Sequence, residues 1–161
     1  MSAGIEQALL DAAHLEPEDD VLVLGGGPLA LGAHERVGDG WVYVVRSQVA
    51  ELEELLGEAH AAGASGVAYL MGEAPVLPLP DGAVAAAVGR IATEEGALAA
   101  AAEELARVLS AGGRASFAEP DEAAGEELAR ALAAAGFEQV EVEPTGEEAL
   151  VSGRLVSGRP G

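Results

Sequence analysis

The hydrophobic and polar positions along this chain alternate between the two periods that separate helices from strands. Residues 2–14 carry apolar side chains at helical spacing, which predicts a short amino-terminal helix. Residues 21–25 form an uninterrupted apolar run, as expected for a strand buried on both faces, and the run leads into consecutive glycines at 25–27. A helix over about 28–37 follows. The chain therefore begins with a helix, a strand, a glycine turn and a second helix.

The same order of elements then repeats. Residues 41–45 are rich in β-forming side chains, and Ser47 is placed to cap a helix over roughly 48–62. Residues 67–71 predict a third strand. The proline-rich segment 74–82 fits neither a helix nor a central strand, so we expect a loop with a tight turn.

The second half of the chain continues this alternation until its last two elements. The predicted elements are a short strand over 83–88, a helix over 93–110, a strand over 114–119, a helix from after Pro120 to Ala135, and two extended segments over 138–143 and 150–157. No helix separates the last two segments. They are joined at 144–146 and can pair as antiparallel neighbours.

Strands that are separated by helices pair in parallel, because a crossover connection is needed between them. The expected fold class is therefore α/β, with a single doubly wound Rossmann-like sheet that is mostly parallel and has an antiparallel carboxy-terminal strand. Residues 1–161 are expected to form one domain, since this length suits a single hydrophobic core.

The charge of the chain bears on its partners. The formal net charge is −20, from 28 acidic and 8 basic residues, and all the basic residues are arginines. Such a surface repels phosphate backbones, which disfavours direct binding of nucleic acid. The chain has no cysteine, so disulfides, zinc-thiolate sites and thiol nucleophiles are excluded. No apolar run has membrane-spanning length, and we expect a cytoplasmic protein without a membrane anchor.

Three histidines are the only other candidates for metal ligands of nitrogen type. They are His14, His34 and His60, and their spacings are unrelated to one another. Isolated histidines are more often surface or capping residues than ligands. We therefore expect no metal site.

Three short motifs stand at the ends of the predicted elements. They are Val21–Pro28 with its glycines, Gly72–Ala74 together with Leu77–Gly82, and Leu105–Arg114 with its Gly-Gly turn. In this order and at this spacing they closely resemble class I S-adenosylmethionine-dependent methyltransferases, over about residues 15–160. The two late extended segments resemble the sixth strand and the antiparallel seventh strand of that family.

The resemblance implies a site for S-adenosylmethionine at the carboxyl ends of the first strands. Gly25, Gly26 and Gly27 match the turn whose backbone approaches the methionine part of the cofactor. Glu73 matches the acidic position that faces the adenine amino group, and Ala74 can offer its backbone N–H to the ring. From the residues alone, these features also fit a tight connection without a ligand and a solvated loop carboxylate.

Several positions depart from the family's pattern. Leu29 stands where a further glycine is usual and would crowd the approach of the cofactor to the helix. Val45 stands where an acidic residue accepts hydrogen bonds from the ribose hydroxyls, and Ala85 where Asp is common. Each buried hydroxyl left poorly paired costs on the order of 1–3 kcal/mol, or roughly tenfold to a hundredfold in affinity. Glu51 lies within the following helix, where its spacing argues against a replacement role.

Two arginines are candidate substrate-binding residues. Arg46 and Arg90 follow the second and fourth predicted strands, whose carboxyl ends share one edge of the sheet. There they can bind an anionic acceptor or a phosphate-bearing ligand, or they can pair with the surplus carboxylates of this acidic chain. No catalytic residue is identified, although methyl transfer often needs little beyond in-line positioning.

Three functions remain open at this stage. The first is a degenerate methyltransferase-like domain, non-catalytic or weakly cofactor-binding, that acts as a scaffold or regulatory partner; the joint departures at Leu29, Val45 and Ala85 motivate it. The second is an active methyltransferase that transfers a methyl group from S-adenosylmethionine to a small molecule. The third is a protein that binds another ligand in the same crevice through Arg46 or Arg90. The expected partners are accordingly a small molecule, another protein or a second copy of the chain.

Overall fold

The computed structural model describes residues 3–25, 27–63, 65–91 and 96–156. Its strands are β1 (Val21–Leu24), β2 (Val42–Arg46), β3 (Val67–Met71), β4 (Val84–Gly89), β5 (Leu109–Glu119), β6 (Phe137–Thr145) and β7 (Glu148–Leu155). Its helices are α1 (Ala3–Ala12), α2 (Gly27–Val37), α3 (Val49–Ala61), α4 (Leu98–Val108) and α5 (Glu122–Ala134). Within the described ranges, no helix is long and apolar enough to cross a membrane.

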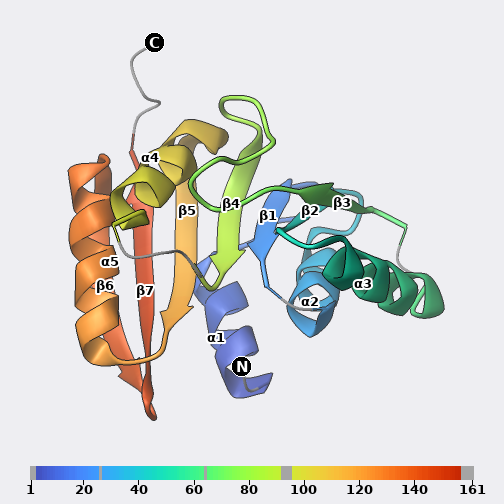
Figure 1. The fold of residues 1–161 in the computed structure, drawn as a ribbon, viewed down its shortest axis with the longest axis horizontal. Coiled ribbons are helices and arrows are strands. Elements are labelled where there is room, and N and C mark those ends of the chain that lie inside the picture. The colour runs from blue at the N-terminus through green and yellow to red at the C-terminus, as the bar shows by residue number, and fades with distance from the viewer. Residues whose placement is uncertain (1–2, 26, 64, 92–95, 157–161) are drawn as a thin grey trace.

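The strands form one sheet in the order β3-β2-β1-β4-β5-β7-β6 (Figure 1). β1 pairs in parallel with β2 on one side and with β4 on the other, so that Val21 lies opposite both Val42 and Ala86. β2 with β3 and β4 with β5 are also parallel, whereas β7 runs antiparallel between β5 and β6. The predicted fold class is confirmed. The strand order switches direction between β1 and β4, and open α/β sheets bind ligands at the carboxyl ends of such a switch point.

Two layers of helices cover the sheet, one on each face (Figure 1). On one face, Leu9 of α1, Leu29 of α2 and Leu55 of α3 pack with Val21 and Val23 of β1. The opposite face is covered by α4 and α5. Its buried side chains include Leu105, Phe117, Leu128 and Leu132. Because α1, α2 and α3 share one face, the amino-terminal helix is part of the core and not an appendage.

The boundary between α4 and β5 differs from the sequence-based expectation. The helix was predicted over 93–110 and the strand over 114–119, whereas α4 ends at Val108 and β5 begins at Leu109. Residues 93–95 lie outside the described residues. Leu109 is buried and pairs with Val84, so sheet pairing overrides the local helical pattern at this point.

Two smaller expectations are also wrong. Ser47 does not cap α3: the residue in the cap position is Gln48, which makes no capping hydrogen bond through its side chain. Pro144 belongs to β6 and not to the turn, because it pairs with Ala149. β6 is the edge strand of the sheet, where a residue without an N–H is tolerated.

Candidate functional site

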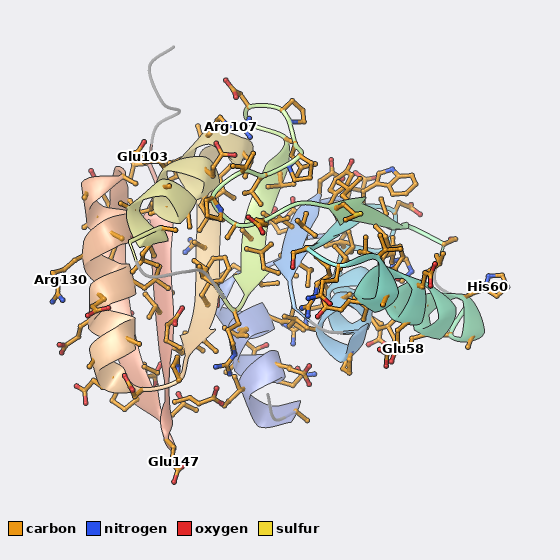
Figure 2. All side chains as sticks on the ribbon, in the orientation of Figure 1. Glu58, His60, Glu103, Arg107, Arg130 and Glu147 are labelled. Atoms are coloured by element: carbon orange, nitrogen blue, oxygen red, sulfur yellow. The ribbon has the colours of Figure 1, made fainter. Side chains whose placement is uncertain are left out.

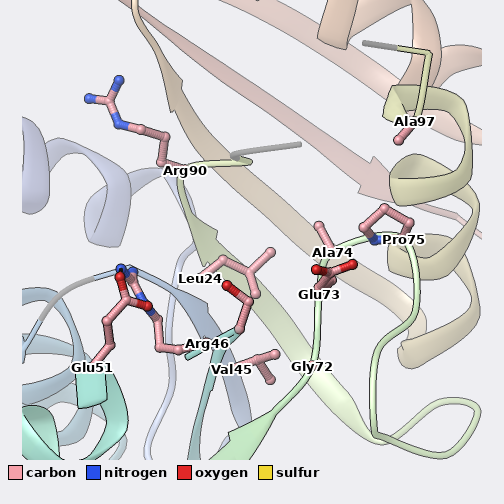
Figure 3. A pocket seen from close by; sticks show the side chains of 11 residues that line it. Leu24, Val45, Arg46, Glu51, Gly72, Glu73, Ala74, Pro75, Arg90 and Ala97 are labelled. Atoms are coloured by element: carbon pink, nitrogen blue, oxygen red, sulfur yellow. Dashed lines mark hydrogen bonds and ion pairs between the residues drawn. The ribbon is translucent and has the colours of Figure 1, made fainter. Parts of the chain in front are cut away.

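A cavity of about 340 Å³ opens at the carboxyl ends of β1, β2, β3 and β4, next to the switch point. Its walls include Leu24 from the end of β1, Val45 and Arg46 from the end of β2, Glu73 after β3, and Arg90 after β4 (Figure 3). Residues that lie far apart in the sequence are therefore brought together where the fold predicts a ligand site.

The glycine turn lies at this edge of the sheet. Gly25 follows β1 directly, Gly27 is the first residue of α2, and Gly26 lies outside the described residues. The described lining residues include Leu24 but not Gly25. Leu29, which we expected to crowd a cofactor, is fully buried in the core and does not line the cavity. Its side chain therefore does not narrow the described cavity.

Gly89 brings β1 and β4 close together at the switch point. It has a φ of 137°, and a Cβ atom placed on it would lie 2.2 Å from the carbonyl oxygen of Leu24. The backbone N–H of the next residue, Arg90, donates to that same oxygen over 2.8 Å. Only glycine allows this approach, which fixes where the backbone of Arg90 meets the cavity.

The wall after β3 carries two of the predicted cofactor residues. Glu73 is exposed at the cavity, and Ala74 is buried beside it. A short turn holds them, since the backbone N–H of Val76 donates to the carbonyl oxygen of Glu73 over 2.9 Å. Gly72 is tied to β2 by a 3.0 Å hydrogen bond from its N–H to the carbonyl oxygen of Arg46. The structure thus places Glu73 and Ala74 together against the ends of β2 and β3.

Arg107 of α4 fixes the proline-rich loop that continues from this wall. Its guanidinium donates to the carbonyl oxygens of Leu77 and Leu79 over 3.0 and 2.8 Å, and to the Asp81 carboxylate over 2.9 Å. Glu104 completes the arrangement, because it accepts from Arg107 and from the backbone N–H of Leu77, each over 2.7 Å. These carboxylates raise the pKa of Arg107 further above its usual value. The loop is therefore held on α4 by charge-assisted hydrogen bonds.

Val45 occupies the position expected to accept hydrogen bonds from a ribose. It is 3% exposed and packs in the core, so it offers the cavity only an apolar surface. Glu51 also lines the cavity, although its spacing in the sequence argued against this. Its carboxylate is bound by Arg46 through two contacts of 3.2 Å (Figure 3). Glu51 reaches the cavity from the first turn of α3, which begins at Val49, only three residues after β2 ends at Arg46.

The second predicted arginine is also paired. Arg90 lines the cavity, but its guanidinium extends away from Glu73 and Ala74 and forms an ion pair with Glu148 at the start of β7 (Figure 3). Both candidate arginines thus lie at the site and both already have carboxylate partners.

Sequence reasoning missed one buried acid at the same edge of the sheet. Glu119 is the last residue of β5 and is 7% exposed. Burial raises its pKa to about 7, Arg90 partly opposes this shift, and Asp121 adds to it. A glutamate that ends an apolar strand at the carboxyl edge was the signal that could have identified it.

The described residues show no group of three or more histidine, aspartate or glutamate side chains arranged to hold a metal ion. The cavity instead combines the cationic side chains of Arg46 and Arg90 with the carboxylates of Glu51 and Glu73. Such a wall suits a ligand that carries both signs of charge.

Comparison with known proteins gives a likeness of structure only. No family model matches the sequence, and no curated protein matches it. The solved structure of the cyclase SpnF superimposes with a TM-score of 0.83 at 19% identity, covering 96% of this chain and 82% of that one. The structure of a geranyl diphosphate methyltransferase in complex with S-adenosylmethionine superimposes with a TM-score of 0.76 at 20% identity. The match covers 95% of this chain and 85% of that one.

A third similar structure includes a partner protein. It is the complex of the Haloferax volcanii Trm112 methyltransferase activator with a putative methyltransferase, with a TM-score of 0.77 at 17% identity, covering 96% of this chain and 90% of that one. Sequence identities this low indicate a shared fold but do not indicate a shared activity. The chain has the fold of the class I S-adenosylmethionine-dependent methyltransferases.

Proposed function

We propose that this chain binds S-adenosylmethionine weakly in the cavity and acts as a methyltransferase-like scaffold or regulatory partner, not as an efficient catalyst. One observation carries the proposal: Glu73 and Ala74, the residues that the resemblance assigns to the adenine, line the same cavity as Val45, which stands where the resemblance expects an acceptor for the ribose hydroxyls. When bound, the cofactor would supply an electrophilic methyl group. The residues of this chain would bind the adenine of the cofactor more strongly than its ribose.

The adenine end of the ligand is the better supported one. Glu73 offers an exposed carboxylate as an acceptor for an exocyclic amino group, and the short turn up to Val76 fixes its backbone. The anchoring of the following loop by Arg107 favours a wall that is formed before the ligand arrives. Leu29 offers no obstruction, since its side chain is buried away from the cavity.

The ribose end is the weaker one. Val45 accepts no hydrogen bond, and the Glu51 carboxylate is already shared with Arg46 at 3.2 Å. A ribose can use Glu51 only in competition with that ion pair. Weak binding is therefore the expected outcome, even though a carboxylate lines the cavity.

The test of the adenine wall is calorimetric titration with S-adenosylhomocysteine. We expect saturable binding by the wild-type protein, and Glu73→Gln should weaken it by about threefold to tenfold, because the amide oxygen still accepts a hydrogen bond but without the charge. The matched control is Glu54→Gln, an exposed α3 glutamate that does not line the cavity. Equal affinities in all three proteins would remove Glu73 from the proposal.

The test of the ribose position is a gain of affinity. Val45→Asp restores an acceptor at the end of β2, and we expect it to raise affinity for S-adenosylhomocysteine by about tenfold. Val45→Asn has the same shape without the charge and should give a smaller gain. Because Val45 is buried, folding of both variants is checked by circular dichroism. A folded Val45→Asp variant with unchanged affinity would contradict the placement of the ribose.

An active small-molecule methyltransferase is the second candidate function. Two findings favour it, namely the burial of Leu29 in the core and the presence of Glu51 at the cavity. Transfer of a radioactive methyl group to small acceptors, slowed by Glu73→Gln when S-adenosylmethionine is below saturation, would replace the scaffold proposal. Binding of a different, anionic ligand is less favoured, because Arg46 and Arg90 are both paired with carboxylates.

A protein partner or a second copy of the chain would act near the free edge of the sheet. Leu56 on α3, Met71 at the end of β3 and Val76 in the next loop are each more than half exposed. The similar structure with its Trm112 activator shows that another protein of this fold assembles with a partner. Light scattering of the wild type and of Met71→Ser tests self-association. A dimer that the variant disrupts supports self-association through this edge, and a monomer in both proteins excludes self-association.

A further inference from the structure

The carboxyl end of β5 places a buried carboxyl group beside the cavity wall. Glu119 is 7% exposed, and its Oε1 atom has no hydrogen-bond partner in the described part of the chain. An ionised oxygen in such a position loses its hydration without replacement, so the surroundings favour the protonated form.

Charged groups from two neighbouring elements face Glu119. Arg90 approaches from the end of β4, and Asp121 from the cap of α5. Glu148, at the start of β7, does not face Glu119 directly, because Ala149 is the residue opposite Glu119 in the antiparallel register. Arg90 interacts electrostatically with Glu119, yet its ion pair is with Glu148. One guanidinium therefore stands between two carboxyl groups.

The protonation of Glu119 changes close to neutral pH. Burial raises the pKa of its carboxyl to about 7, while the charge of Arg90 lowers it and that of Asp121 raises it. Glu148 is less buried, with 22% of its side chain exposed. The two carboxyl groups thus differ in environment, although they share one cation.

We propose that Glu119 and Glu148 compete for the Arg90 guanidinium, and that a proton on Glu119 decides which of them Arg90 pairs with. The structure shows the arrangement expected with the proton bound, in which Arg90 pairs with Glu148 and Glu119 keeps an unpartnered oxygen. When the proton leaves to solvent, Glu119 becomes a buried carboxylate, and Arg90 is the cation that faces it. Arg90 then turns from Glu148 towards Glu119.

This exchange moves the charge of a side chain that belongs to one of the residues lining the cavity, Arg90. Its consequence for ligands rests on the proposed function: affinity for S-adenosylhomocysteine would then differ between about pH 6 and pH 8, on either side of the Glu119 titration. The exchange itself needs no ligand.

The experiment is an NMR titration of the ligand-free protein, following the Glu119 side-chain carboxyl carbon and the Arg90 Nε–H group. We expect the Arg90 signal to shift with the same midpoint as Glu119 in the wild type and to stay constant over that range in Glu119→Gln. Glu148→Gln leaves Arg90 permanently available to Glu119, which should lower the Glu119 midpoint by about one pH unit.

A matched control separates the exchange from simple charge effects. Asp121→Asn removes one negative charge but keeps a side chain that can cap α5, so it should lower the Glu119 midpoint while Arg90 still follows it. If Glu119→Gln does not fold, the Glu148→Gln and Asp121→Asn variants still decide the question. An Arg90 signal that ignores the Glu119 titration, or a midpoint unchanged in Glu148→Gln, would overturn the proposal. Failure of S-adenosylhomocysteine to bind would overturn only the proposed function.

Discussion

At the residue scale, Gly89 is the position where the backbones of β1 and β4 come close together at the switch point. Its φ is 137°, and a Cβ atom there would lie 2.2 Å from the Leu24 carbonyl oxygen, so alanine cannot be accommodated without moving β1 or β4. We predict that Gly89→Ala lowers the free energy of unfolding by roughly 2–4 kcal/mol, as for a strained position with a steric clash. Gly57→Ala in α3 is the matched control. A Cβ atom placed on Gly57 meets no atom within 4 Å, so this variant should raise the free energy of unfolding by about 0.5–1 kcal/mol. Urea denaturation measures both; equal effects would contradict this account of the switch point.

Glu119 makes a second prediction at this scale, in the pH dependence of stability. Its pKa is about 7 in the folded state against 4.5 as the ordinary value, so the folded state holds the proton more tightly. The stabilising contribution is complete below about pH 4.5 and is lost as the pH rises through 7. The wild type therefore loses free energy of unfolding as the pH rises from about 5 to about 8, and Glu119→Gln does not. The difference in free energy of unfolding between the two proteins should change by roughly 1–3 kcal/mol in favour of Glu119→Gln over this range. A stability difference that is constant over this range would show that Glu119 has an ordinary pKa.

The sequence predicted the positions of some site residues and not of others, because side-chain positions depend on how the elements pack. Val45 could be recognised as an apolar residue at the end of a strand, and the structure has it there. The direction of the Leu29 side chain was not predictable, because it depends on how α2 packs on β1. The position of Glu51 at the cavity depends on the short connection between β2 and α3. The burial of Glu119 depends on the elements that pack around the end of β5.

At the scale of elements, Arg107 joins α4 to the loop after β3. Its donors to Leu77, Leu79 and Asp81 hold a loop that has no regular hydrogen bonding of its own. We predict that Arg107→Gln accelerates amide hydrogen exchange at Leu77 and Gly82, and lowers the free energy of unfolding by roughly 1–3 kcal/mol. Gly82 is included because its N–H donates to the Arg107 carbonyl oxygen.

Arg130→Gln is the control for this prediction. Arg130 lies on the outward side of α5, remote from the loop (Figure 2). Its removal should leave exchange at Leu77 and Gly82 unchanged. If the two arginine variants behave alike, the loop is held by its prolines and its packing and not by Arg107.

The order of the elements could be predicted because hydrophobic periodicity is a local property. Element ends were less predictable when they depend on pairing. β5 begins at Leu109 because this residue pairs with Val84, and β6 includes Pro144 because the hairpin continues to Thr145 at an edge of the sheet. The Ser47 cap was a sound local pattern that the actual start of α3 does not use.

At the scale of the whole molecule, the net charge of −20 must oppose compaction. The ion pairs of Arg36, Arg46, Arg90 and Arg107 offset only part of the acidic surplus. We predict that the melting temperature rises by several degrees between low salt and moderate sodium chloride, because salt screens the self-repulsion. Differential scanning calorimetry checks this; a fall with salt would mean that the ion pairs outweigh the repulsion.

We have proposed that the carboxyl edge of the sheet binds the adenosyl part of S-adenosylmethionine. The most direct measurement is a titration of the isotopically labelled protein with S-adenosylhomocysteine, followed by amide NMR. We expect saturable changes in the amide chemical shifts of residues 45–51, Glu73, Ala74 and Arg90, with small changes elsewhere. A folded protein whose spectrum does not change at millimolar ligand would contradict it.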